Sequence, residues 1–161
     1  MEAAAFTLEL RQRLNLPDAT EDCWCPLCDG VLDRYNHHAA TCVAGGERIQ
    51  RHNAVRDLLF TWRPMTPSPP AAADIYIPAL VFAITACETQ GSVFVPMVAE
   101  TTGTWDAGAA IVLRHVAQAV AAQSGEEAGP LHSTLIQELS ITIRSYRVRA
   151  ALRRRLAAVE A

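Results

Sequence analysis

The chain has 161 residues and a net charge of −3, with 14 basic side chains against 17 acidic ones and half of its residues hydrophobic. A chain of this length forms one domain or two small ones and can bury a core without disulfide staples. The composition excludes collagen, a coiled coil and wholesale disorder, and because all 14 cations are arginine, it excludes any mechanism that needs a catalytic lysine.

The sequence shows neither the pattern of a membrane-spanning helix nor that of a signal peptide. No apolar run approaches the roughly 20 residues of a membrane-spanning helix, because the run Ala79–Thr85 is followed closely by Cys87 and Glu88. The first residues, Met1-Glu2-Ala3, lack the basic and apolar regions of a signal peptide. We therefore expect an intracellular protein with no membrane partner. In a reducing compartment, five cysteines indicate a metal site more than disulfides.

Three structured segments and a linker are expected in the first half. Apolar residues among good helix formers predict a helix within residues 2–14, in an N-terminal region of residues 1–22. A cysteine-rich module runs from Cys23 to about Gly46. Helical spacing then predicts a helix over Glu47–Trp62, on the apolar positions Ile49, Val55, Leu58, Leu59 and Trp62. Four prolines within residues 63–73 predict an extended linker.

In the second half, residues 74–161, the residue pattern predicts short strands followed by long helices. Residues 74–85, interrupted at Pro78, and residues 93–99 have strand composition. A helix is expected after Asp106 and as far as Gln123, with one apolar face formed by Ile111, Val112, His115, Val116 and Ala119. A loop at Ser124–Pro130 and a last helix from Leu131 to about Val159 follow, with a stripe of Leu135, Leu139, Ile143 and Tyr146 and with Arg144, Arg147, Arg154 and Arg155 mostly off it. The predicted class is α+β, short of strands for an independent sheet.

Four metal-ligand side chains have the spacing of a structural zinc site. Two residues separate Cys25 from Cys28, nine residues lead to His38, and three more lead to Cys42. Each close pair can present two donors to one ion from a tight turn, and soft thiolates with an imidazole favour zinc over calcium or magnesium. Because four protein ligands leave no position open for water, the predicted zinc is structural rather than catalytic.

Other interpretations of these residues stay open. His37 could replace His38, and Cys23 could replace Cys25, although Cys25 and Cys28 have the more common two-residue spacing. The thiols could also lie in the core or at the surface without a metal. A redox Cys-x-x-Cys is less expected, because no strand precedes the pair in a βαβ context.

From Cys25 onward the chain contains, in order, CPLC, DRYNHHAATC, GGERIQRHNAVRD, a proline linker, ADIYIP, FAIT, CETQGSVFVPMVAETTGTW and a long helix with QELS. This order resembles the C-terminal region of non-LTR retrotransposon polyproteins, reverse transcriptase-like proteins in which a CCHC zinc motif lies beside a PD-(D/E)XK-type, restriction-like endonuclease core. In that family an Asp-His pair usually precedes the last cysteine, and His37-His38 stands there in this chain, which makes His38 the equivalent ligand. The resemblance also implies a nuclear location and an upstream reverse transcriptase domain as a partner.

The resemblance further implies where nuclease chemistry would lie. Restriction-like enzymes hold one or two Mg²⁺ ions with carboxylates that end adjoining strands, and a lysine normally lies near the second carboxylate. Asp74 matches the first catalytic aspartate of the family, although it could equally be a turn residue before a strand. The second carboxylate, expected near Val81, is missing, and so is the lysine.

One other set of residues would allow nuclease activity. Asp74 with Glu88 and Gln90 can be written as a D…E-x-Q pattern in which glutamine replaces the lysine. Glu88 and Gln90 match a later segment of the family better than its active-site strand. The favoured interpretation is therefore an incomplete endonuclease core that does not cleave DNA.

Two arginine clusters are candidates for contact with DNA or RNA. Arg48, Arg51, His52 and Asn53 follow the zinc loop at the head of a helix, where side chains and unpaired N–H groups can meet phosphate. Arg144 and Arg147 begin a second, denser cluster, which could instead be a solvated face or a face packed on another domain. A pI near 5.9 argues against strong non-specific binding, so any binding would use these local patches.

These observations predict a zinc-stabilised nucleic-acid-binding remnant of a retrotransposon endonuclease region. One alternative is an active Mg²⁺-dependent DNA-nicking endonuclease that uses Asp74 and Glu88. The other is a protein-interaction module whose arginine helix does not bind nucleic acid.

Overall fold

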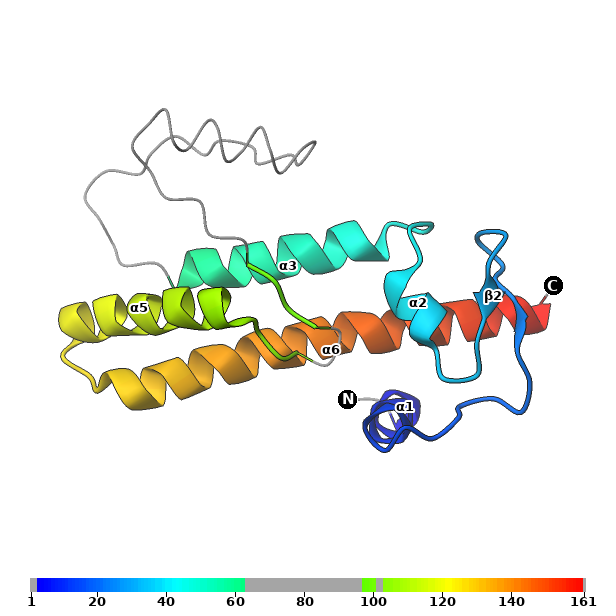
Figure 1. Ribbon diagram of the computed structural model, residues 1–161, viewed down its shortest axis with the longest axis horizontal. Coiled ribbons are helices and arrows are strands. Elements are labelled where there is room, and N and C mark those ends of the chain that lie inside the picture. Colours follow the sequence, from blue (N-terminus) through cyan, green and yellow to red (C-terminus); the bar gives the residue numbers. More distant parts are fainter. Residues whose placement is uncertain (1–2, 63–96, 101–102, 161) are drawn as a thin grey trace, which may run out of the picture. The chain divides into compact units, whose positions relative to one another are not determined.

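The computed structural model describes residues 3–62, 97–100 and 103–160 (Figure 1). Its elements, in chain order, are α1 (Ala3–Arg13), β1 (Cys23–Trp24), β2 (Val31–Leu32), α2 (His37–Thr41), α3 (Glu47–Thr61), α5 (Ala107–Ser124) and α6 (Ala128–Glu160). The described part is mostly helical with one small sheet, which agrees with a mixed α+β class. None of its helices is both long enough and apolar enough to cross a membrane.

The contacts divide the chain into two compact units. The first contains residues 1–61, 100–104 and 136–161, and the second contains residues 62–99 and 105–135. The first unit thus includes α1, the sheet, α2, α3 and most of α6. The sequence predicts a continuous second half from residue 74 onward, whereas the contacts group most of the last helix with the N-terminal module.

The sheet of the first unit is minimal. β1 and β2 are antiparallel, with Cys23 opposite Leu32 and Trp24 opposite Val31. An isolated hairpin is at best marginally stable in water, so strands of two residues depend on the elements that cover them. The strands pack into a single buried cluster, to which α1, β2, α2, the loops and α6 contribute Leu8, Cys25, Leu32, Ala39, Cys42, Val148 and Ala151.

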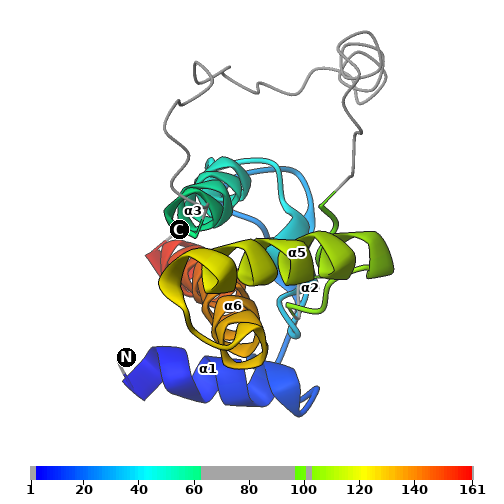
Figure 2. The ribbon, with the colours of Figure 1, turned by 90° about the vertical axis from the view of Figure 1, so that its left-hand side faces the viewer.

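α1 supplies one face of that cover. The helix lies across the part of α6 that belongs to this unit, since α1 is seen end-on in Figure 1 and lengthwise in Figure 2. Leu8 is its one buried residue, while Leu10 on another face is exposed. α1 therefore contributes one fully buried side chain to the cluster, and Ala5 packs against it.

The second unit contains α5, whose two ends have clear stop signals. Asp106 is the N-cap, and its carboxylate accepts hydrogen bonds from the N–H groups of Gly108 (2.8 Å) and Ala109 (3.3 Å). At the other end Gly125 adopts a left-handed conformation, with φ of 76°, and its N–H donates to the Ala121 carbonyl. These caps explain why the helix bounds agree with the predicted ones to within a residue.

The predicted face of α5 is wrong. The buried residues are Ala109, Leu113, Ala117 and Ala121, whereas Ile111 is 55% exposed and His115 is also exposed. Three of the four buried residues are alanines, which are good helix formers but carry little hydrophobic weight in a periodicity. The larger residues dominate the periodicity and therefore predict the wrong face. In α3, similarly, the predicted core position Ile49 is exposed, and Glu47 is the buried residue.

α6 differs from its prediction at the start and in its polar residues. It begins at Ala128, so Pro130 lies in its first turn, where proline is tolerated because the N–H groups there have no partner within the helix. Leu135, Leu139 and Ile143 are buried as predicted. Arg147 and Arg154, expected mostly off the buried stripe, are buried as well.

The predicted linker and most of the predicted strands of the endonuclease-like core lie outside the described residues. Of the second strand, residues 93–99, the structure describes the end, where Ala99 forms an isolated antiparallel bridge with Trp105.

Replacing Leu8 with alanine should lower the free energy of unfolding by about 2–5 kcal/mol, because a fully buried side chain leaves a cavity under the sheet. Leu10→Ala is the matched control on the same helix, and its effect should stay within about 0.5 kcal/mol. The exposed fractions of 1% for Leu8 and 45% for Leu10 set this contrast. Urea denaturation of the two variants measures it, and equal losses would contradict the assigned core.

Candidate metal centre

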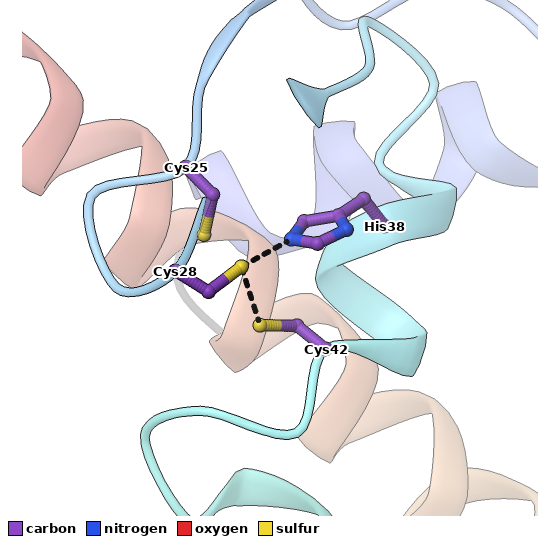
Figure 3. A group of neighbouring side chains, drawn as sticks. All are labelled: Cys25, Cys28, His38 and Cys42. Atoms are coloured by element: carbon purple, nitrogen blue, oxygen red, sulfur yellow. Dashed lines mark hydrogen bonds between the residues drawn. The ribbon is translucent and has the colours of Figure 1, made fainter. Parts of the chain in front are cut away.

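Cys25, Cys28, His38 and Cys42 lie together in the first unit (Figure 3). Their ligand atoms are all within 4.8 Å of one another. The Cys28 Sγ atom is 3.3 Å from His38 Nε2 and 3.6 Å from Cys42 Sγ. Cys25 and Cys42 are buried, and the other two are partly buried. This group of three thiols and one imidazole could hold a metal ion.

The first pair of ligands lies on the turn between β1 and β2. The Cys25 N–H donates to the Gly30 carbonyl (2.8 Å), and the Gly30 N–H points to the Cys28 Sγ atom (3.4 Å). A Cβ atom at Gly30 would lie 2.5 Å from His38 Cε1. A side chain at this position would therefore displace the imidazole of His38.

The second pair lies at the two ends of α2, and Asp33 holds the start of that helix. Its Oδ1 atom accepts the N–H groups of Tyr35 (3.0 Å) and His37 (3.1 Å), and Oδ2 accepts that of His38 (2.7 Å). Burial raises the pKa of the Asp33 carboxyl, but these N–H groups outweigh it and the pKa is lowered. The anion thus orients the backbone of the His38 ligand.

Asn36 completes the turn into α2. It adopts a left-handed conformation, with φ of 62°, that asparagine tolerates better than most residues. The residue is fully buried, and its amide nitrogen lies 3.4 Å from Asp18 Oδ2. The turn reverses the chain so that His38 faces the cysteine pair.

The two alternative ligands lie outside the cluster. His37 is exposed, with Nδ1 3.7 Å from Asp33 Oδ1, and its ring stacks on that of Tyr35 at a centroid distance of 5.9 Å. The Cys23 Sγ atom accepts a hydrogen bond from Arg155 Nη1 (3.6 Å). The structure therefore brings His38 and Cys25 to the site, and neither His37 nor Cys23.

A fully buried guanidinium, that of Arg154, lies beside Cys42. Its Nη2 atom donates to the Ala44 carbonyl (2.9 Å) and to Glu47 Oε2 (3.2 Å), and Nη1 donates to the Ala150 carbonyl (3.1 Å). Glu47, buried at the start of α3, also pairs with Arg153 at 3.3 Å. These bonds connect α6 to the loop after the last cysteine.

The surroundings shift the pKa values of the Cys42 and Cys28 thiols in opposite directions. Burial raises the pKa of the Cys42 thiol, but the Ala44 N–H and the Arg154 guanidinium outweigh it, and the pKa is lowered. The Gly30 N–H lowers the pKa of the Cys28 thiol, whereas burial and the thiols of Cys42 and Cys25 raise it, and the net direction is upward. Crowded thiols cannot all ionise easily in each other's company, and a cation among them removes that conflict.

The residues predicted to contact nucleic acid are distributed over different environments. Arg48 and His52 are exposed on α3, and Arg51 and Asn53 are partly buried. Arg144 is partly buried, with Nε 3.7 Å from Glu9 Oε1, and Arg147 is buried. Asp74, Glu88 and Gln90, the predicted catalytic residues, lie outside the described residues.

Several residues that build the site are missing from the sequence-based prediction. Asp33 precedes the helix by a few residues, and an acidic residue in that position is a recognisable capping signal. Arg154 stands in a run of three arginines, where nothing in the local pattern separates the buried one from its neighbours. Its role depends on groups more than 100 positions earlier in the chain.

Comparisons of the chain with protein-family models, with curated proteins and with solved structures find no match. The function of the chain must therefore be inferred from its own residues.

Arg154→Met should lower the free energy of unfolding by about 3–5 kcal/mol, because Glu47 would keep a buried charge without its buried partner. Arg153→Met is the matched control: the two neighbours share Glu47, but the Arg153 side chain is 62% exposed against 0% for Arg154. Its cost should stay below about 1 kcal/mol. Denaturant unfolding of both variants tests the difference, and similar costs would rule out the assigned role of Arg154.

Proposed function

We propose that the protein is a zinc-stabilised nucleic-acid-binding module related to the endonuclease region of non-LTR retrotransposon polyproteins, and that it does not cleave DNA. The observation that carries the proposal is the convergence of Cys25, Cys28, His38 and Cys42 on one point. The resemblance of the motif order to that family adds the nucleic-acid role, a nuclear location and a reverse transcriptase partner to the same proposal.

Zinc fits the spacing of the donor atoms. With Zn–S and Zn–N bonds near 2.3 and 2.0–2.1 Å, a tetrahedral site has edges of about 3.8 Å between sulfurs and about 3.6 Å between sulfur and nitrogen. The Cys28–Cys42 and Cys28–His38 distances are 3.6 and 3.3 Å. These edges match within a few tenths of an ångström, and the wider separations within the group require only side-chain adjustment.

The local charges also favour an ion that is bound by several thiolates. Zn²⁺ with three thiolates and a neutral imidazole carries one net negative charge. Arg154 lies beside Cys42 and can offset that charge, while its bonds to Ala44 and Glu47 keep it in place. A closed set of four protein ligands supports a structural role for the ion.

The nucleic-acid role is supported by the helix after the last ligand. α3 begins five residues after Cys42, and its first two turns present Arg48 and His52 to solvent. Exposed arginines on a helix that is anchored by a rigid metal loop can pair with phosphate groups in a fixed geometry. The absence of nuclease activity is supported by the sequence, which has no carboxylate near Val81 and no lysine.

Metal analysis of the purified protein should find one zinc per chain, and His38→Ala should reduce the zinc affinity by orders of magnitude, because the site loses one of four ligands. His37→Ala, the adjacent histidine on the same helix, should leave the affinity unchanged. Co²⁺ titration should show the absorption of a tetrahedral thiolate site in His37→Ala, with an altered spectrum in His38→Ala. Equal behaviour of the two variants would overturn the proposed zinc site.

Nucleic-acid binding is tested by fluorescence anisotropy with a labelled duplex and a labelled single strand over a range of salt. Arg48→Ala should weaken binding and lower the salt slope by about one ion, because one phosphate contact is lost. Arg114→Ala, which removes an exposed arginine of α5, controls for the change in net charge.

Supercoiled DNA incubated with the protein and Mg²⁺ or Mn²⁺ should stay intact. Nicking that disappears in Asp74→Ala would establish the active endonuclease instead.

A further inference from the structure

Arg147 is a buried cation that forms no direct ion pair with the described residues. The residue is 9% exposed, and its Nε atom has no hydrogen-bond partner. Within the described ranges no carboxylate lies within ion-pairing distance of its guanidinium. Arg154 on the same helix is also buried and its Nε atom also lacks a partner, yet its two terminal nitrogens have three acceptors. A buried charge without a direct partner is costly, so the contrast between three acceptors for Arg154 and none among the described residues for Arg147 points to a ligand.

Two arginines of α3 lie on the same side. Arg51 is partly buried, and its one hydrogen bond to the described residues goes from Nη1 to the Ala40 carbonyl (3.3 Å). Burial lowers the pKa of the Arg51 guanidinium, and the positive charges of Arg48 and Arg147 lower it further. Burial likewise lowers the pKa of the Arg147 guanidinium. Arg51 thus lies within electrostatic range of Arg48 on its own helix and of Arg147 on α6.

The acidic groups whose charge reaches Arg147 are already engaged. Glu9 and Asp33 both act on it electrostatically. The Glu9 carboxylate binds Arg13 at 2.9 Å and lies 3.7 Å from Arg144. The Asp33 carboxylate accepts three backbone N–H groups at the start of α2. Glu9 could turn to Arg147 only by giving up Arg13 and Arg144, and Asp33 only by breaking the bonds that start α2.

We propose that Arg51 and Arg147, with Arg48 at the rim, form a binding site for a phosphate group between α3 and α6. A phosphate oxyanion offers several acceptors to forked guanidinium donors and can neutralise more than one of them at once. This inference deepens the proposed function, on which it depends for the source of the phosphate, because it identifies where a phosphodiester of the nucleic-acid backbone would bind. The chemistry is shared with free phosphate, and the experiments separate the two sources.

The first experiment uses inorganic phosphate and the zinc-loaded full chain. Phosphate should raise the melting temperature in a saturable way, relative to chloride at the same ionic strength. Arg147→Met should lose that response, while its melting temperature in chloride should be no lower than that of the parent, since the unpaired buried charge is gone. Arg56→Met removes an exposed arginine of α3 that is paired with Asp57, and should keep the full response. If Arg147→Met does not fold, Arg51→Gln replaces it with the same expectation.

Loss of the response in Arg147→Met alone would support the site, because a purely structural arginine would change the melting temperature in chloride and phosphate equally. No response to phosphate in the parent, or an unchanged response in Arg147→Met and Arg51→Gln, would overturn it.

The second experiment measures the affinity for a labelled oligonucleotide in the same variants. Binding that falls about tenfold in Arg147→Met and in Arg51→Gln, but not in Arg56→Met, would assign the site to the nucleic-acid backbone. A phosphate response without oligonucleotide binding would leave the anion site standing and overturn the proposed function. Oligonucleotide binding that is equal in all the variants would keep the proposed function and overturn the assignment of the site to the nucleic-acid backbone.

Discussion

The first unit depends on the bonds that hold one buried charge, the guanidinium of Arg154. Arg154 has no access to solvent, and every bond it makes reaches a group that must be correctly placed: the carbonyl after the last cysteine, the carboxylate that starts α3, and a carbonyl of α6 itself. A guanidinium in this position is tolerated only when all three are present. Arg154 therefore fixes the position of α6 relative to the loop after the last cysteine and to the first residue of α3.

The metal ligands and the bonds of Arg154 stabilise the same small region. Two-residue strands and a five-residue helix cannot bury enough apolar surface to fold alone. Leu8 and Ala151 cover the cysteine turn with apolar surface, Asp33 orients the histidine backbone, and Arg154 reaches the last cysteine. A bound ion would connect the turn to α2 at their centre. Each contribution is modest, and their convergence on one loop makes the region a defined structure.

The sequence predicts local features well and distant ones poorly. The spacing of the ligands, the helix at Glu47 and the Asp106 start of α5 depend on neighbours within a few residues, and all of them agree with the structure. The apolar face of α5 is assigned wrongly because alanines form it. The burial of Arg147 and Arg154 escapes prediction because periodicity assigns arginine to solvent, and only a tertiary partner or a ligand can reverse that preference.

The long separation along the chain between Arg154 and its partners has a consequence for biosynthesis. The Arg154–Ala44 and Arg155–Asp33 bonds join groups 110 and 122 positions apart. During translation the cysteine loop leaves the ribosome long before its covering helix exists, and non-local contacts of this kind form late. Until the last helix emerges, the thiols remain open to cellular oxidants and to competing metals. Early capture of an ion would protect the nascent loop through that interval.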